Sequence, residues 1–256
     1  MKPRIIRDLD AWYEKNCNPG FIASDPVQFP HRYVKREDIE IAAFLSASIA
    51  WGRRDLILRS AEKMFALTGK SPWRYVKSGA YCSLKKGNIH RTFFESDLKY
   101  FCRGFAGCYA KYGSLEKLYS SAGNIWEGNA LFREEMAAAN GGKYSKHISN
   151  PGPEGKNGSA CKKLNLALRW LVREGPVDLG LWKSIDPSSL YIPLDVHVAR
   201  SARKLGLLKR KSNDKKAVIE LTENLKSICP KDPVKYDFAL FTAALPKAPL
   251  APEFHR

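Results

Sequence analysis

Apolar positions recur at intervals of three and four residues along nearly the whole chain, which is the period of amphipathic helices. No segment of any length shows the strict alternation of a half-buried strand, and no internal repeat is present. Helices are predicted at residues 3–16, 37–51, 53–67, 96–112, 114–120, 122–139, 159–173, 196–205, 213–227 and 232–245, with a further helix start at Ser71-Pro72. The pattern therefore predicts an all-α protein.

One long polar segment interrupts the helical pattern. Residues 140–159 are rich in glycine and proline and have no apolar periodicity. A loop of this length is usually a linker or a functional loop. We expect a flexible loop here, within a single unit of residues 1–256. It would separate a helical lobe at 35–140 from another at 159–245, with residues 1–34 packing across both.

The helix that follows this loop has two distinct faces. Its apolar residues fall on one face at helical spacing, which predicts a core contact for Cys161, Leu164, Leu168, Leu171 and Val172. Polar residues form a separate stripe, made of Lys162, Asn165, Arg169 and Arg173. Lys163 points elsewhere, near Ala167 and Trp170. The stripe is either a solvated basic face or part of a site that binds an anionic partner.

The segment Tyr191-Ile-Pro-Leu-Asp-Val-His-Val-Ala-Arg-Ser-Ala-Arg-Lys-Leu-Gly-Leu-Leu208 places a carboxylate at a helix start. Asp195 follows Pro193 and precedes an apolar seam at helical spacing. It is therefore predicted to be the N-cap residue, whose carboxylate accepts backbone N–H groups at the positive end of the helix dipole. A helix cap without any further role is the simplest interpretation.

Composition narrows the class of protein. The chain has 256 residues, 44% of them hydrophobic, which indicates a globular protein with one sizeable core or two modest lobes. Six cysteines form no CxxC pair and no zinc spacing, and the first residues lack an apolar signal segment. We therefore expect reduced thiols, a cytoplasmic and nucleoid-associated protein, no membrane span, no metal and no cofactor.

The net charge of +17 favours a polyanionic partner such as nucleic acid. Trp51-Gly-Arg-Arg54 joins an aromatic ring to two cations at a helix end. These residues either stack on a base and hold a phosphate, or form a buried tryptophan beside a solvated surface. His197 likewise either contacts a phosphate or packs. Metal binding is not expected, because the five histidines have no ligand spacing.

Pro193-Leu-Asp-Val-His-Val-x-Arg200, followed by a helix ending in Leu-Gly-Leu, resembles the catalytic-aspartate segment of the helix-hairpin-helix DNA glycosylases, the endonuclease III superfamily. The resemblance implies two helical lobes with a base-binding cleft between them. It also implies that Asp195 is the catalytic carboxylate and that Lys162 is the amine nucleophile. Lys162 precedes Asp195 by 33 positions, which is closer to the archaeal 8-oxoguanine glycosylases than to endonuclease III.

Those archaeal enzymes also use an Asp and an aromatic residue four positions later to recognise the base. Asp237 and Phe241 stand at this spacing in Lys235-Tyr-Asp-Phe-Ala-Leu-Phe241. The resemblance covers roughly residues 159–245. Over its whole length, the chain is also similar to an uncharacterised bacterial family with Asp-Pro-Val-x-x-Pro-His, Ala-Trp-Gly and Asp-Pro-Val-Lys-Tyr-Asp-Phe-Ala-Leu-Phe motifs.

Two features of endonuclease III are absent from the sequence. No Leu-Pro-x-Val-Gly hairpin precedes Asp195, so the hairpin is expected to be irregular. The four-cysteine iron–sulfur loop is also missing, since Cys229 is the only cysteine after Cys161.

The resemblance implies a bifunctional base-excision repair glycosylase that removes an oxidised purine such as 8-oxoguanine from double-stranded DNA, with AP-lyase activity, acting as a monomer. Its implied catalytic pair is Lys162 and Asp195, and its implied base pocket is Asp237, Phe241 and Trp51. The expected DNA contacts are Arg53, Lys163, Arg169, Arg173, His197 and Arg200. A monofunctional glycosylase, a non-catalytic nucleic-acid-binding protein with the same fold and an RNA-processing enzyme remain alternatives.

Overall fold

The computed structural model describes residues 3–153 and 155–242, and most of these residues are helical. The first seven helices are α1 (Pro3–Asn16), α2 (Arg36–Ser48), α3 (Arg54–Thr68), α4 (Pro72–Lys77), α5 (Glu95–Tyr112), α6 (Leu115–Ser120) and α7 (Ile125–Ala138). The remaining four are α8 (Lys162–Val172), α9 (Val196–Lys204), α10 (Lys215–Lys226) and α11 (Asp237–Thr242). The all-α prediction is confirmed. The last three positions of the predicted helix 232–245 lie outside the described residues.

Local sequence signals explain where most helices begin and end. The side chains of Ser71, Ser114, Asn124 and Asp214 accept backbone N–H groups at the starts of α4, α6, α7 and α10. Gly113 ends α5 in the left-handed conformation, at a φ of 78°. Six 3-10 turns connect the helices, and proline begins five of them: Pro19–Ser24, Pro26–Gln28, Pro30–Arg32, Pro187–Ser189 and Pro233–Tyr236; the sixth is Ala80–Ser83.

Two details differ from the sequence predictions. A short antiparallel hairpin, β1 (Asn88–His90) and β2 (Phe93–Phe94), lies where no strand was expected. Strands of three and two residues are too short to show an alternating pattern. Asp232 was predicted to cap a helix, but it makes no cap hydrogen bond and instead accepts the guanidinium of Arg173.

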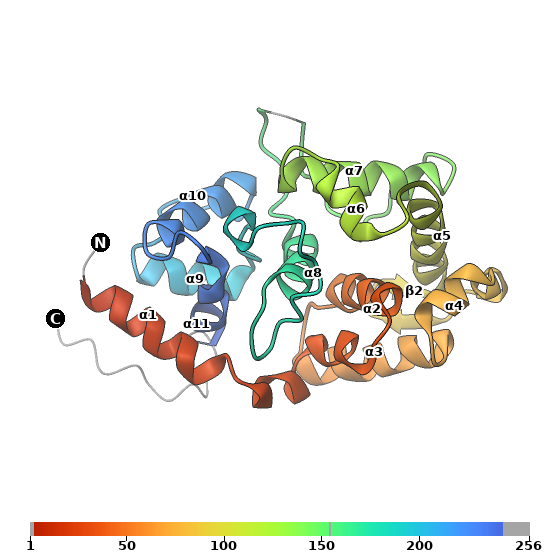
Figure 1. Ribbon diagram of the computed structural model, residues 1–256, viewed down its shortest axis with the longest axis horizontal. Coiled ribbons are helices and arrows are strands. Elements are labelled where there is room, and N and C mark those ends of the chain that lie inside the picture. Colours follow the sequence, from red (N-terminus) through yellow and green to blue (C-terminus); the bar gives the residue numbers. More distant parts are fainter. Residues whose placement is uncertain (1–2, 154, 243–256) are drawn as a thin grey trace.

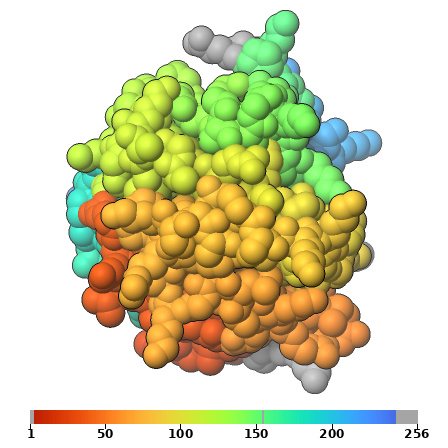
Figure 2. All heavy atoms as spheres, turned by 90° about the vertical axis from the view of Figure 1, so that its right-hand side faces the viewer, coloured from red at the N-terminus to blue at the C-terminus, as the bar shows by residue number. Residues whose placement is uncertain are grey.

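The helices are arranged on two sides of α8 (Figure 1). Helices α2 to α7 lie on one side, and Figure 2 shows α3 to α7 (orange to green) forming one continuous face of the molecule. Helices α1, α9, α10 and α11 lie on the other side (Figure 1), where α11 contacts both α1 and α9. The 3-10 turns between residues 19 and 32 join the two sides. Residues 3–34 therefore contribute to both.

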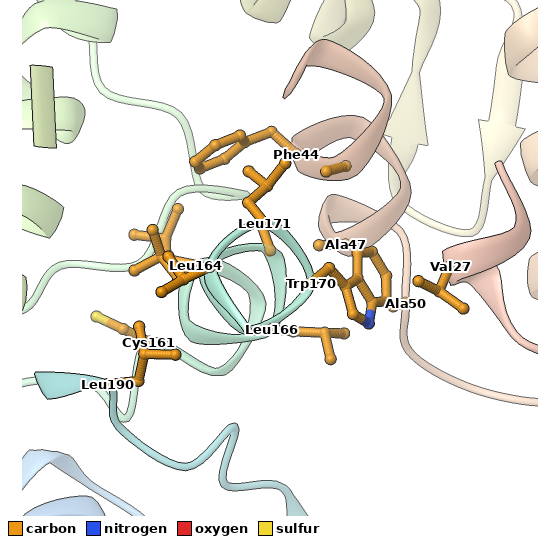
Figure 3. Packing of buried hydrophobic residues seen from close by; sticks show 14 of the residues in the cluster. Val27, Phe44, Ala47, Ala50, Cys161, Leu164, Leu166, Trp170, Leu171 and Leu190 are labelled. Carbon is orange, nitrogen blue, oxygen red and sulfur yellow. The ribbon is translucent and has the colours of Figure 1, made fainter. Parts of the chain in front are cut away.

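Helix α8 is the centre of the core, which forms one continuous cluster of buried side chains. Its whole predicted apolar face is buried, from Cys161 to Val172. Figure 3 shows Leu171 pointing toward Phe44 of α2, and Trp170 lying beside Ala47 and Ala50. These contacts pack the C-terminal half of α8 against α2. None of the described helices has the length and apolarity that a membrane crossing would require.

Candidate active site

A cleft of about 910 Å³ lies where the first turns of α3, α8 and α9 meet α11 and the 3-10 turns after α1. Nearly all of the predicted site residues line it. They are Trp51, Arg53, Lys162, Lys163, Arg169, Asp195, His197, Asp237 and Phe241. The fold thus brings together residues that are separated by up to 190 positions in the chain. Arg173 and Arg200 are not among the residues that line the cleft.

Lys162 is the first residue of α8, directly after Cys161, whose φ of 49° places it in the left-handed region. The Nζ atom of Lys162 donates a hydrogen bond to the carbonyl oxygen of Ala50 at 2.8 Å. A cation in the first turn of a helix experiences the positive end of the helix dipole. Together with the unusual backbone at Cys161, this is an electrostatically unfavourable position of the kind that is retained at functional sites.

Lys163 also reaches the cleft, in contrast to the helical-wheel prediction that it points away. Its Nζ atom lies 3.8 Å from the centroid of the Trp51 ring, a cation–π contact. Burial, together with the positive charge of Lys162, lowers the pKa of this amine to about 8, while Asp97 opposes the shift. The helical-wheel prediction considers only the direction of the Cα–Cβ bond. The long side chain of Lys163 nevertheless reaches the ring of Trp51.

The prediction that Asp195 caps α9 is confirmed. Its Oδ1 atom accepts the backbone N–H groups of His197 at 2.8 Å and Val198 at 3.0 Å. Pro193 and Leu194, just before it, are buried and line the same cleft. The carboxylate is therefore held at the cleft wall by both the helix start and the preceding buried segment.

Asp237 and Arg169 form the floor of the cleft. Asp237 is 5% exposed and is ion-paired with Arg169, whose Nη2 atom also lies 3.3 Å from Oδ1 of Asp178. Burial raises the pKa of Asp237 to about 6, and the negative charges of Asp195 and Asp178 act in the same direction. The charges of Arg169 and Lys162 oppose this shift. Asp195 and Lys162 are thus close enough to Asp237 to influence its protonation.

Three further residues lie on this side of the cleft: Phe21 and Asp25 are not among the site residues predicted from the sequence, and Arg54 is predicted only as a candidate phosphate contact beside Trp51 and Arg53. The guanidinium of Arg54 lies 5.4 Å from the ring centroid of Phe21 and 5.3 Å from that of Phe241. Its Nη2 atom is 3.7 Å from Oδ2 of Asp25. Burial raises the pKa of Asp25, although its Oδ1 atom accepts the backbone N–H of Val27. The sequence signal for Asp25 is its place at the start of the Asp-Pro-Val-x-x-Pro-His motif.

Trp51 stands between the cleft and two histidines. The ring of His90 meets it edge-on at 4.8 Å, and the ring of His147 stacks on it at 5.8 Å. His147 comes from the 140–159 loop, but it is only 5% exposed, and its Nε2 atom lies 3.1 Å from the carbonyl oxygen of Thr92. At least this part of the predicted flexible loop packs against the core. A base stacking on the face of Trp51 that Lys163 covers would have to displace that amine.

A basic rim borders the cleft at the start of α3. Arg53 is largely exposed and pairs with Asp55, while Arg91 is exposed and has no ion pair within residues 3–153 and 155–242. Gly52, at a φ of 99°, lies directly under the Arg91 guanidinium, so that an added Cβ would be only 2.6 Å from Nη1 of Arg91. His90 fixes the hairpin that carries Arg91, because its Nε2 atom bonds to the Trp51 carbonyl at 2.9 Å. The rim is thus a rigid array of cations.

Two expected DNA contacts are corrected by the structure. Arg173 is 1% exposed, and its guanidinium is bound by Asp178 and by both carboxylate oxygens of Asp232. Arg169 is 4% exposed and is bound by Asp178 and Asp237. Both guanidinium groups are buried and face carboxylates, so neither extends from the surface toward a DNA phosphate. The two arginines of the predicted basic stripe therefore belong to an internal ion-pair network.

Arg200 is exposed on α9, outside the cleft, and His197 lies within it, half-buried. Their role as DNA contacts stays a prediction. Among residues 3–153 and 155–242, no three His, Cys, Asp or Glu side chains are grouped as they would be around a metal ion.

Comparison with known families identifies a single family. Residues 25–245 match the model of a family described as a protein of unknown function, DUF2400, and the chain belongs to this family. Comparisons with curated proteins and with solved structures gave no match. The matched region begins at Asp25 and includes every cleft residue except Phe21.

Proposed function

We propose that this protein is a bifunctional DNA glycosylase that excises an oxidised purine from double-stranded DNA and then cleaves the abasic site. One observation carries the proposal. Lys162 and Asp195, separated by 33 positions, both stand at the first turns of helices and both line one cleft. An amine and a carboxylate placed together in this way supply the two groups that this chemistry requires.

In this proposal, the neutral amine of Lys162 attacks C1′ of the sugar as the glycosidic bond breaks and the base departs with the bonding electrons. The nitrogen then loses one proton, the C1′–O4′ bond of the sugar opens with a proton passing to O4′, and a protonated Schiff base forms between Lys162 and C1′. Loss of a C2′ proton then expels the 3′ phosphate. Asp195 stabilises the positive charge that develops on the sugar, because its carboxylate is fixed at the cleft wall before the reaction begins.

The first turn of α8 places Lys162 and Lys163 next to each other at the positive end of the helix dipole, and both line the cleft. The target base must leave the duplex, which costs a few kcal/mol. Phe241 and Asp237 offer an aromatic surface and a carboxyl group on the cleft floor to receive it. The basic rim and the net charge of +17 suit a phosphate backbone.

Borohydride trapping tests the role of the lysine. Wild-type protein is expected to form a covalent adduct with 8-oxoguanine duplex DNA in the presence of borohydride, and Lys162→Gln is expected to form none. Lys216→Gln is the matched control, because Lys216 is an exposed lysine in the first turn of α10 that does not line the cleft. If wild type and Lys162→Gln trap DNA equally, Lys162 is not the nucleophile.

Asp195→Asn tests the carboxylate separately from the helix cap. Asparagine is as good an N-cap residue as aspartate, so the free energy of unfolding should change by less than about 0.5 kcal/mol. Base release should nevertheless fall by about 10²–10³-fold, since the charge is lost. Asp186→Asn, at the exposed cap of Pro187–Ser189, is the control. Undiminished base release by Asp195→Asn would contradict the proposal.

One observation favours a second candidate. The hydrogen bond from Lys162 to the Ala50 carbonyl links α8 to the segment that follows α2. A lysine can make such a bond only to stabilise the fold, without taking part in chemistry. A monofunctional glycosylase would use Asp195 with water and leave Lys162 in this bond. Base release without any trapped adduct would select this candidate, and DNA binding without base release would select a non-catalytic binding protein.

A further inference from the structure

Buried polar atoms without a hydrogen-bond partner gather around the cleft. In the part of the chain that the structure describes, ten side-chain atoms are buried and lack such a partner, and four of them belong to residues that line the cleft. These four are Nη2 of Arg54, Nε of Arg169, Nδ1 of His197 and Oδ1 of Asp237. Most buried polar atoms in proteins are hydrogen-bonded. This concentration therefore indicates a ligand that supplies the missing donors and acceptors.

Arg54 provides one of the donors among these atoms. Its guanidinium lies between the rings of Phe21 and Phe241, which fix its position without using its N–H groups. Its Nη1 atom is 3.4 Å from Oγ of Ser24, and its Nη2 atom is 3.7 Å from Asp25, beyond hydrogen-bond distance. Nη2 therefore has no hydrogen-bond acceptor among the described residues, and Arg54 lines the cleft.

Asp237 provides the matching acceptor. One carboxyl oxygen, Oδ2, is bound by Arg169, and Oδ1 has no hydrogen-bond partner within residues 3–153 and 155–242. Asp237 begins α11, and Phe241, which contacts Arg54, lies one turn further along the same helix. Arg54 and Asp237 thus line the same cleft, and Phe241 contacts Arg54 from the helix that Asp237 begins.

We propose that the cleft floor recognises the lactam edge of a nucleobase, with Arg54 donating to its carbonyl oxygen and Asp237 accepting from its adjacent ring N–H. This inference rests on the proposed function and makes its substrate more specific. Lactam edges occur in 6-oxopurines and in oxopyrimidines of the uracil type. Adenine and cytosine carry an amino group beside an unprotonated ring nitrogen, so their amino donor would face the Arg54 donor.

A site built from buried hydrogen-bonding groups discriminates strongly against a ligand that leaves those groups unpaired. The rings of Phe21 and Phe241 provide apolar area for either kind of base, so they do not discriminate. Arg54 should therefore control the choice of base without controlling the chemistry at the sugar. In this respect it differs from Lys162 and Asp195.

Binding to uncleavable duplexes tests this proposal independently of catalysis. Duplexes that carry a 2′-fluoro sugar under 8-oxoguanine or 8-oxoadenine differ at the base edge and resist cleavage. Wild type should bind the 8-oxoguanine duplex at least about 100-fold more tightly. Arg54→Met should reduce this preference to within about fivefold. Arg59→Met, on the same helix but largely exposed, should retain it. A second pair of duplexes carries 5-hydroxyuracil, which has a lactam edge, or 5-hydroxycytosine, which does not. Comparing the preferences within the purine pair and the pyrimidine pair shows which class of base the site recognises.

Equal wild-type affinity for both members of each pair would overturn the inference, as would an unchanged preference in folded Arg54→Met. The wild-type comparison tests the inference even if that variant does not fold. A clear lactam preference without base release from the corresponding cleavable duplexes would leave the inference standing and contradict the proposed glycosylase activity.

Discussion

The two ends of α8 carry their positive charges in opposite ways. Arg169 and Arg173, near its C-terminal end, are buried and ion-paired with Asp178, Asp232 and Asp237. Lys162 and Lys163, in its first turn, have no ion pair among the described residues. Their ammonium groups meet a backbone carbonyl and an aromatic ring instead.

The helix dipole increases this difference. Cations at the C-terminal end of a helix are stabilised by it, and cations in the first turn are destabilised. At the arginine end of α8, carboxylates balance the positive charges in a buried network. At the lysine end, no carboxylate of the described residues pairs with the two amines, which lie at a cleft. We infer that the lysine end is maintained for chemistry and the arginine end for stability. Substitutions at the two ends should consequently have opposite effects on the free energy of unfolding.

The largest effect is expected from Arg173→Met. This change leaves Asp178 and Asp232 without their main cationic partner in a buried place. Breaking a buried ion pair in this way costs about 3–5 kcal/mol. Urea denaturation should show this loss, while Arg103→Met, at an exposed position on α5, should change the free energy of unfolding by less than about 0.5 kcal/mol. A loss below about 1 kcal/mol for Arg173→Met would argue that the network is not structural.

Lys163→Met should have the opposite sign. Since the pKa of Lys163 is lowered to about 8 in the folded protein, below its ordinary value of 10.5, its protonated form destabilises the fold. Removing the amine should stabilise the protein by about 2–3 kcal/mol at pH 7. Between pH 8 and about 10.5 the unfolded chain binds the proton and the folded protein does not, so wild type gains stability and the difference shrinks.

Thermal or urea denaturation from pH 7 to pH 10 would measure this difference. A Lys163→Met protein that is less stable than wild type at pH 7 would contradict the comparison of the two ends. A stability difference that is independent of pH would show that the effect of the substitution comes from packing against Trp51 and not from the charge of Lys163.

A smaller effect is expected at the basic rim. Arg91→Gln should weaken binding of undamaged duplex DNA by about tenfold at low salt, and should reduce the slope of log K against log[salt] by about 1. Arg173→Met should leave this slope unchanged, since its guanidinium is internal. Fluorescence anisotropy over a salt series measures both. An unchanged slope for Arg91→Gln would show that Arg91 does not contact the DNA backbone.

The helices could be predicted from the sequence because their signals are local. Capping residues such as Ser114 and Asp195, and the glycine Gly113 that ends α5, lie within one turn of the helix end that they define. The apolar face of α8 follows from apolar residues that recur at helical spacing. The hairpin at residues 88–94 could not be found in this way. Its strands are too short for a pattern, and His90 holds it to Trp51, 39 positions away.

The candidate site was only partly predictable. Lys162, Asp195, Asp237 and Phe241 were identified from motifs, and the fold brings them to one cleft. Arg173 looked like a surface cation because its partner Asp232 lies 59 positions later in the chain. Arg54 was noticed only as part of a basic run, since its contacts with Phe21 and Phe241 depend on how the two ends of the chain fold together.

The most direct test of the account locates the trapped amine. Wild-type protein is incubated with 8-oxoguanine duplex DNA and borohydride, digested with protease, and the nucleotide adduct is assigned by mass spectrometry. The account predicts a single adduct on Lys162, which persists in Lys163→Arg and disappears in Lys162→Gln. An adduct on Lys163, or no adduct while base is released, would contradict the assignment of Lys162 as the nucleophile.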